Sequence, residues 1–236
     1  LAFQDAQLVM AREYGFDSWP KLTAAIGDAP TPLPLADGFV GNSLVADRIR
    51  TEMDRAAAND LPVLILGEKG VGKRLVARTI HALSRRSAGP LVYLTCDAEN
   101  GLLCESELLG YEPGAFTGAN TSQAGSLQFA EGGTLVLDEV GGLQSAAQAK
   151  LQHFIERGGY RRLAGTQDLT ADTRLLGTSS RDLGQLVKSG AFREDLYYQF
   201  RVLCIEVPPL RDRADDIPAL ASFWAGRLCN GHRETP

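Results

Sequence analysis

The feature that most constrains the fold is a glycine-rich turn placed between an apolar run and a helical stretch. Residues 62–68 read PVLILGE, and residues 71–86 read VGKRLVARTIHALSRR. A strand, a glycine-rich turn and a helix in this order are typical of a phosphate-binding loop, because backbone N–H groups and the helix dipole both face the anion. We therefore expect nucleotide phosphates to be bound by consecutive residues of this turn: Gly67, Glu68, Lys69, Gly70, Val71, Gly72, Lys73 and Arg74.

The last two residues of this turn carry different expectations. Lys73 has the position of the lysine that reaches the outer phosphates of a nucleoside triphosphate. The strict pattern continues with Ser or Thr, whose hydroxyl helps to hold Mg²⁺, whereas this chain has Arg74. A glycine-rich surface turn without a ligand is the alternative that this segment alone leaves open.

An acidic pair supports the nucleotide hypothesis. Residues 135–139 read LVLDE, an apolar run that ends in Asp138 and Glu139. Carboxylates at the carboxyl end of a buried strand lie where ligands bind in open α/β sheets. We expect Asp138 to hold Mg²⁺ through water and Glu139 to polarise the water that attacks the phosphate. An exposed acidic turn is the alternative.

Apolar runs alternate with helical stretches along the rest of the chain. The later runs lie at residues 91–96, 133–140, 173–180 and 202–208. Apolar strands that alternate with helices predict a parallel sheet covered by helices on both faces. Residues 158–168 read GGYRRLAGTQD, and this polar segment predicts a hairpin.

The first 38 residues have a different character. Residues 1–28 have the spacing of two short helices and predict a small helical N-terminal segment. Residues 29–38 contain three prolines at alternate positions, which favours a stiff Pro-rich linker. We place a domain boundary near residue 38, and because the chain begins with Leu1 rather than Met we expect it to be a fragment.

Composition narrows the classes of function. The chain has 236 residues, 44% of them hydrophobic, and a formal net charge of -5, which argues against nucleic-acid binding by bulk charge. The sequence has no apolar run long enough to span a membrane and no opening signal segment. No C-x-x-C pair occurs, so we expect reduced, mostly buried thiols in a cytoplasmic protein at Cys96, Cys104, Cys204 and Cys229.

One loop raises a separate question. Residues 114–119 read GAFTGA, which places one large aromatic, Phe116, between glycines with no charged residue among them. Glycine permits backbone conformations that other residues rarely adopt, so a tight turn with Phe116 packed into the core is one interpretation. The other is an exposed contact for a partner, because exposed apolar groups often mark interaction sites.

From about Phe39 to its end, the chain resembles the AAA+ central domain of bacterial sigma-54 enhancer-binding activators. The matching motifs occur in order: GEKGVGK, ESELLGYEPGAFTGA, GGTLVLDEV, QAKLQHFIERGGYRRLAG, FREDLYY and VPPLRDRADDIP. The resemblance implies an α/β fold, namely a P-loop NTPase AAA+ three-layer α/β/α sandwich with a five-stranded parallel sheet. It assigns residues 39–210 to the nucleotide-binding, sigma-54 interaction domain and residues 211–236 to the start of a truncated helical lid.

The resemblance also implies a function. Proteins of this family bind ATP between the subunits of a ring, expected here to be a hexamer, hydrolyse it to ADP and phosphate, and remodel the sigma-54 RNA polymerase holoenzyme. DNA binding is expected only through a C-terminal helix-turn-helix module outside this chain, and no membrane contact is expected. The loop that touches sigma-54, with its aromatic ring exposed, would consist of Gly114, Ala115, Phe116, Thr117, Gly118 and Ala119.

Several positions depart from the family pattern. Arg74 replaces the usual Glu, and a cation there could grip phosphate or disturb the metal. Thr95 stands where the family has the Asn that restrains the catalytic glutamate. Ser179 and Ser180 stand where it has the Thr-Asn sensor of the γ-phosphate.

The largest departure is in the segment FREDLYYQF, from which the family offers two arginines to the ATP of a neighbouring subunit. Arg193 keeps the first, Gln199 replaces the second, and Arg201 could substitute. An arginine supplied in trans can accelerate hydrolysis by about 10³-fold or more. A surface ion pair with a nearby acid is the alternative for Arg193. The resemblance thus assigns catalytic roles to Glu139, Arg193, Thr95 and Ser180.

These departures leave alternatives open. The first hypothesis is an ATP-hydrolysing activator of sigma-54 polymerase. The second is a degenerate regulatory or scaffold module that binds nucleotide with little or no hydrolysis and in which residues 1–27 could dock a partner. A third, another ring ATPase such as a helicase loader or chelatase, explains the nucleotide site but not the aromatic loop.

Overall fold

A computed structural model describes residues 39–96 and 101–231 of the chain. The helical segment expected at residues 1–28 and the linker expected at 29–38 lie outside the described residues. Two compact units can be separated. The larger is Ile49–Pro209, and the smaller combines the segments Leu1–Arg48 and Leu210–Pro236.

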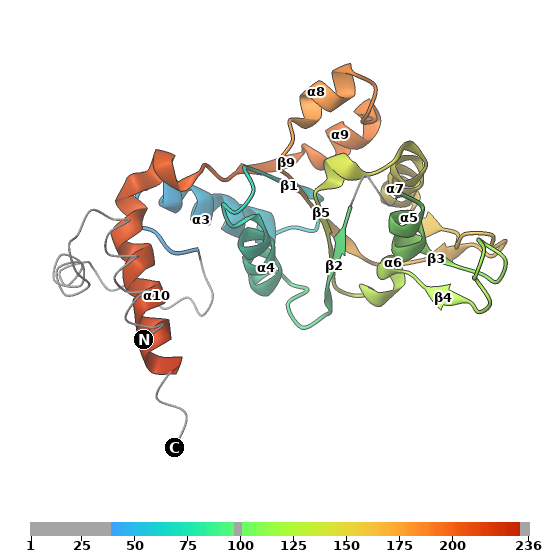
Figure 1. The fold of residues 1–236 in the computed structure, drawn as a ribbon, viewed down its shortest axis with the longest axis horizontal. Coiled ribbons are helices and arrows are strands. Elements are labelled where there is room, and N and C mark those ends of the chain that lie inside the picture. Colours follow the sequence, from blue (N-terminus) through green and yellow to red (C-terminus); the bar gives the residue numbers. More distant parts are fainter. Residues whose placement is uncertain (1–38, 97–100, 232–236) are drawn as a thin grey trace. The chain divides into compact units, whose positions relative to one another are not determined.

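The larger unit is built on a five-stranded parallel sheet with the strand order β2-β5-β8-β1-β9 (Figure 1). The expected fold class is confirmed, because every pairing in this sheet is parallel and each strand falls on one of the apolar runs. The strands are β1 (Val63–Leu66), β2 (Leu91–Thr95), β5 (Thr134–Asp138), β8 (Arg174–Ser179) and β9 (Leu203–Glu206).

Helices cover both faces of this sheet because successive side chains along each strand point in opposite directions. In β5, Leu135 and Leu137 belong to one apolar cluster, whereas Val136 between them is equally buried on the other face. Helix α4 (Lys73–Leu83) lies on one side of the sheet, and α5 (Gly101–Leu109) and α7 (Ser145–Arg157) lie on the other (Figure 1).

Shorter elements complete the larger unit. The expected polar hairpin is present as β6 (Gly159–Tyr160) and β7 (Leu169–Thr170). A second hairpin, of β3 (Gly110–Tyr111) and β4 (Gln123–Ala124), was not foreseen from the sequence. The remaining elements are α6 (Ser126–Phe129), η2 (Val140–Gly142), α8 (Leu183–Lys188) and α9 (Glu194–Phe200).

The smaller unit, in its described part, joins residues 39–48 to residues 210–231. It contains η3 (Leu210–Asp216) and α10 (Ile217–Gly231), while α3 (Leu44–Ala57) begins in it and continues into the larger unit. The buried carboxylate of Asp216 accepts hydrogen bonds from the backbone N–H of Ser43 at 2.7 Å and from its hydroxyl at 2.9 Å. Residues 39–48 therefore group with the C-terminal segment by their contacts.

Cys96 and Cys104 are buried thiols, and Cys204 is a half-buried one. Among the described helices, none combines the length and the apolar character that a membrane crossing requires.

A histidine at the far end of α4 fixes this helix against β5. His81 is buried, and its Nδ1 lies 2.9 Å from the hydroxyl of Thr134 at the start of β5. Burial, and secondarily the charge of Arg174, lowers the pKa of His81, although a backbone hydrogen bond with Gly89 opposes the shift. Helix α4 thus runs opposite to β5, so that the start of the helix lies beside the end of the strand.

We expect stability to decline as the pH falls below the ordinary pKa of histidine, about 6.5. In that range the histidine is protonated in the unfolded chain, whereas buried His81 stays neutral in the folded protein. The free energy of unfolding therefore drops by at most about 1.4 kcal/mol per pH unit, until the pH falls below the lowered pKa of His81. His81→Gln should flatten this part of the profile, measured by urea unfolding between neutral and mildly acidic pH. His153→Gln, at an exposed site on α7, is the control and should keep the slope.

Candidate functional site

The candidate site lies at the edge of the sheet where β1, β5 and β8 end. The glycine-rich turn follows β1 directly, and the N–H of Gly67 donates to the carbonyl of Ser179 at the end of β8. Gly70 and Gly72 have positive φ angles of 83° and 104°, and the space in front of both is open. Glycine adopts this conformation readily, and because it has no side chain the backbone of the turn stays accessible to a ligand.

Lys73, the first residue of α4, is bound by oxygens of the turn and of the acidic pair. Its ammonium group donates to the carbonyls of Gly67 at 2.9 Å and Glu68 at 3.1 Å, and lies 3.1 Å from a carboxylate oxygen of Glu139. The side chain is only 7% exposed. The turn and the acidic pair, 66 residues apart from Lys73 to Glu139, therefore meet at one cation.

Glu139 is held in an unusual conformation at the end of β5. Its φ of 59° and ψ of 54° lie in the left-handed region, which is uncommon for a residue other than glycine and often marks a functional position. One carboxylate oxygen accepts hydrogen bonds from both the backbone N–H and the hydroxyl of Ser180, each at 2.8 Å. Burial alone raises the pKa of Glu139, but the bonds from Ser180 and the proximity of Lys73 outweigh it, so the pKa lies below its ordinary value.

Asp138 is engaged by protein groups on both of its oxygens. The hydroxyl of Thr178 donates to one oxygen at 2.6 Å, and the Arg74 guanidinium lies on the other, with Nε and an Nη each at 2.9 Å. The same guanidinium donates to the hydroxyl of Thr95 at 3.3 Å and lies 5.7 Å from the ring centre of Tyr93. Thr95, expected to act near Glu139, thus has Arg74 as its partner.

These contacts do not fit the Mg²⁺ that we expected at Asp138. The position that would supply a metal-binding hydroxyl carries a cation, and the carboxylate already has a donor on each oxygen. Over residues 39–96 and 101–231, no cluster of three His, Cys, Asp or Glu side chains could hold a metal ion.

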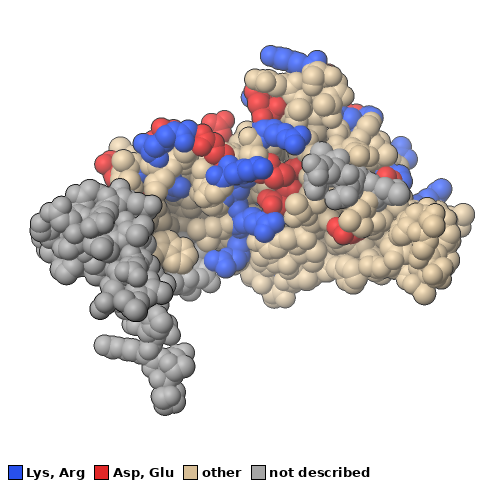
Figure 2. All heavy atoms as spheres, viewed as in Figure 1, with Lys and Arg blue, Asp and Glu red and all other residues tan. Residues whose placement is uncertain are grey.

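A cleft with a volume of about 530 Å³ opens beside the turn. It is lined by the turn residues Gly67 and Glu68, by Ser180, and by Tyr197 and Arg201 on the far side. The guanidinium of Arg201 lies 5.4 Å from the ring centre of Tyr197. Figure 2 shows Lys and Arg atoms directly beside Asp and Glu atoms in the middle of the view, so the local field is mixed rather than uniformly positive.

Arg193 does not join this cluster. It precedes α9, and its guanidinium makes a double contact with Asp195, at 3.1 and 2.7 Å, while its backbone N–H donates to Gln148. This is the surface ion pair that we considered as the alternative. Gln199, farther along α9, donates to Glu156 at 3.2 Å. Both residues are thus bound on the surface of their own chain, away from the glycine-rich turn.

The GAFTGA loop is the tip of the β3–β4 hairpin. It is closed by a hydrogen bond from the N–H of Gly114 to the carbonyl of Ala119 at 2.9 Å. Thr117 is exposed, but Phe116 is only partly so, because its ring packs edge-on against Tyr111 with 4.9 Å between the centroids. Phe116, expected to be exposed, is therefore exposed only in part, because its ring is supported by the base of its own hairpin.

The second hairpin supports the base of this loop. The N–H of Glu112 donates to the carbonyl of Leu163, and the N–H of Leu163 donates to the carbonyl of Gly110, both at 2.9 Å. Arg162 adds contacts at 2.9 Å to the carboxylate of Glu112 and to the side-chain oxygen of Gln128. The turn of the β6–β7 hairpin and the base of the GAFTGA loop thus form one bonded assembly.

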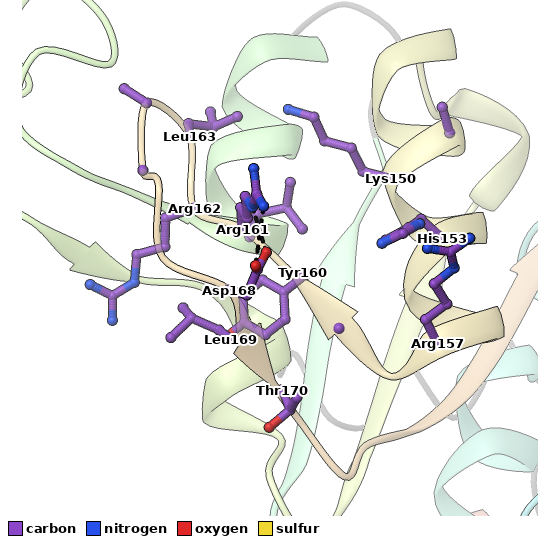
Figure 3. Close-up of a pocket in the computed structure, with 15 residues that line it drawn as sticks. Lys150, His153, Arg157, Tyr160, Arg161, Arg162, Leu163, Asp168, Leu169 and Thr170 are labelled. Atoms are coloured by element: carbon purple, nitrogen blue, oxygen red, sulfur yellow. Dashed lines mark hydrogen bonds and ion pairs between the residues drawn. The ribbon is translucent and has the colours of Figure 1, made fainter.

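A further cavity, of about 860 Å³, separates α7 from the β6–β7 hairpin. Lys150 and His153 extend into it from α7, and Arg161 and Asp168 of the hairpin form an ion pair across its wall (Figure 3). None of the residues of the glycine-rich turn or the acidic pair lines this cavity. The cavity therefore belongs to the region around the GAFTGA loop rather than to the nucleotide site.

Three features of the site were missed from the sequence: Thr178, the left-handed backbone of Glu139 and the Arg74–Asp138 pair. Thr178 donates to Asp138 and accepts from the N–H of Glu139 at 3.1 Å. Its only signal was its position near the end of an apolar run, at the same edge of the sheet as the acidic pair. The other two depend on how strands and helix are placed in space.

Comparison with known proteins identifies relatives over most of the chain. The family model of the sigma-54 interaction domain matches residues 39–206. The chain is 44% identical over 205 residues to the transcriptional regulatory protein ZraR of Klebsiella oxytoca, covering 86% of this chain and 46% of that protein. It is 45% identical over 189 residues to the anaerobic nitric oxide reductase transcription regulator NorR of Aeromonas salmonicida, covering 80% and 37%.

Solved structures agree with the fold. The chain is similar to the crystal structure of NtrX from Brucella abortus in complex with ATP, with a TM-score of 0.74 and 31% identity, covering 98% of this chain and 49% of that one. A P-loop NTPase domain of a sigma-54 activator from E. coli, at 23% identity and a TM-score of 0.51, covers 72% of this chain and 99% of its own, and supports the fold alone. This chain spans less than half the length of the curated relatives. With its five-stranded parallel sheet and AAA+ P-loop NTPase fold, the chain belongs to the sigma-54 interaction domain family of transcriptional regulators.

Proposed function

We propose that this chain is the ATP-binding and ATP-hydrolysing part of a regulator that remodels sigma-54 RNA polymerase through the GAFTGA loop. The observation that carries the proposal is the contact of Lys73 with Glu139 at 3.1 Å, beside an accessible glycine-rich turn. A phosphate-binding cation and a carboxylate able to activate water are thus brought together by different elements. The structure of NtrX in complex with ATP supports ATP as the nucleotide.

The chemistry assigned to the site follows from its charges. Lys73 and the N–H groups of residues 67–72 would hold the phosphates. Glu139, with its lowered pKa, is a carboxylate at neutral pH and can orient and deprotonate the attacking water. Ser180 holds one oxygen of Glu139, so a shift of Ser180 on nucleotide binding would release the carboxylate for this role.

We also propose assembly into a ring, expected to be a hexamer, with Arg193 offered to the ATP of the neighbouring subunit. Arg193 is exposed, and among the described residues its ion pair is with Asp195, two residues away. An exposed pair of this kind contributes little to stability, so it can be exchanged for a phosphate contact at low cost. DNA binding would require a module outside this chain.

A continuous segment connects the site to the loop. Glu139 follows β5 at the edge of the sheet that holds the candidate site, and η2 and then α7 come after it in the chain. Helix α7 leads into the β6–β7 hairpin, which is hydrogen-bonded to the base of the GAFTGA loop. A helix of 13 residues is about 20 Å long. A displacement at Glu139 could therefore be carried through α7 to the loop, as in switch segments that respond to the γ-phosphate.

The partner surface has a distinct chemistry. Residues 113–130 contain no charged side chain, and the tip of the hairpin, at the right of Figure 2, is free of Lys, Arg, Asp and Glu atoms on the face shown. An uncharged loop with an exposed threonine and a half-exposed phenylalanine suits a contact made by packing and neutral hydrogen bonds. This supports a protein partner, sigma-54, over the phosphate backbone of DNA.

A second candidate function is a module that binds nucleotide without hydrolysing it. The pairing of Arg74 with Asp138 favours it, because the carboxylate that would hold Mg²⁺ is engaged. The replacement of an arginine by Gln199 also favours it, since glutamine supplies no charge to a neighbouring phosphate.

Steady-state phosphate release from the intact protein separates the two candidates. Glu139→Gln should lower the rate by about 10²-fold or more, because the amide cannot accept the proton of the attacking water. The matched control Glu107→Gln changes an exposed glutamate on α5 and should leave the rate unchanged. Equal release by the native protein and Glu139→Gln would favour the module without hydrolysis.

Nucleotide binding is checked with the same preparations. Lys73→Ala should abolish ATP binding, whereas Lys188→Ala, at an exposed site on α8, should bind as the native protein does. Binding by Lys73→Ala at native affinity would show that the phosphate site is assigned wrongly.

Thr117 provides a separate test of the loop. Thr117→Ala should leave ATP turnover within about twofold of native, because Thr117 is exposed at the hairpin tip. Promoter opening by sigma-54 RNA polymerase, measured by transcription in vitro, should be lost. Thr121→Ala, an exposed threonine nearer the base of the loop, is the control. Native transcription by Thr117→Ala would rule out this loop as the contact.

A further inference from the structure

Arg74 is held in place by contacts on several sides. Its Nε and an Nη bind one oxygen of Asp138, the same Nη donates to Thr95, and the guanidinium lies against Tyr93. The backbone carbonyl of Arg74 is in turn approached by the Tyr93 hydroxyl at 3.5 Å. A planar guanidinium bound at its edge by a carboxylate and placed near an aromatic ring has restricted rotational freedom.

The location of this guanidinium is chemically specific. Arg74 follows Lys73 in the first turn of α4, where the phosphate-loop pattern places the hydroxyl that binds a metal ion. Asp138, at the end of β5, is the carboxylate expected on the other side of that ion. The positive charge of Arg74 therefore occupies one of the two positions that would face a divalent cation and pairs with the carboxylate at the other.

A divalent cation and Arg74 would compete for the same carboxylate. The remaining oxygen of Asp138 accepts a hydrogen bond from Thr178 at 2.6 Å, so a metal ion or its water would have to share each carboxylate oxygen with a donor that is already bound. Placing a second cation beside the guanidinium would also add repulsion between like charges. Both effects disfavour a metal-bound nucleotide.

The guanidinium keeps capacity for an anion. Its side chain is 60% exposed, and it uses Nε and one Nη for its contacts. Among the described side chains, none accepts a hydrogen bond from the other Nη. Arginine can bind a carboxylate and a phosphate at the same time, because its N–H donors point in several directions of one plane.

We propose that Arg74 replaces the divalent metal ion in the nucleotide site, so that the nucleotide binds as the metal-free anion. The inference rests on the proposed function, since it requires ATP to occupy the turn of residues 67–72. Asp138 then acts as the residue that positions Arg74 rather than as a ligand of a metal.

The test compares ATP binding with and without metal, by calorimetric titration of the intact protein in Mg²⁺ buffer or in EDTA. The native protein should bind ATP with dissociation constants that agree within about twofold in the two buffers, whereas Arg74→Thr should bind at least about tenfold more tightly with Mg²⁺ than with EDTA. Arg78→Thr, which removes an exposed arginine one turn farther along α4, should behave as the native protein does.

Each other outcome has a distinct meaning. Native protein that binds ATP only with Mg²⁺ would overturn the inference while leaving the proposed nucleotide site intact. Failure of the native protein to bind in either buffer would overturn the proposed function itself. Arg74→Thr that remains indifferent to Mg²⁺ while binding ATP well would also overturn the inference. If this variant unfolds, Arg74→Lys, which keeps the charge but loses the planar fork, should weaken ATP binding in EDTA, and unchanged affinity would count against the proposal.

Discussion

The site depends on the contact between the first turn of α4 and the end of β5. Lys73 and Arg74 bring positive charge to Glu139 and Asp138, and each cation lies within 3.1 Å of its carboxylate. Lys73 is buried and Glu139 is partly buried, so each charge lowers the cost of burying the other. The bond between His81 and Thr134 at the opposite ends of the same elements prevents the helix from sliding along the strand. Helix register and charge pairing thus support each other.

The departures at Arg74, Thr95 and Ser180 lie at one edge of the sheet although they are scattered in the sequence, whereas Gln199 lies apart from them. Arg74 and Thr95 are bonded to each other, and Ser180 takes over the restraint of Glu139. A change at one of these positions therefore alters the partners available to the next. Substitutions that are far apart in the sequence can therefore belong to one altered network of side chains. This favours a site whose metal chemistry has changed over a site that has lost its function through unrelated substitutions.

Much of the fold was predictable from the sequence, because its strands are short apolar runs that alternate with helical stretches. Such strands form a parallel sheet, in which the carboxyl ends of all strands lie at the same edge. The glycine-rich turn and the acidic pair were predictable for the same reason. The partners of Arg74 were not, since a long side chain can reach several acids and only the placement of α4 over β5 selects Asp138. The packing of Phe116 on Tyr111 was hidden as well, because the β3–β4 pairing that brings them together involves only two residues on each strand.

The closed form of the GAFTGA loop has a mechanical consequence. A flexible loop would have to become ordered on binding its partner, and it would bend when a force is applied to its base. Here the bond from Gly114 to Ala119 and the ring contact of Phe116 give the tip a shape before any partner arrives. The partner then binds a loop that is already ordered, so little conformational entropy is lost on binding. A displacement at the base of such an ordered loop is transmitted to its tip, because the loop does not bend in between.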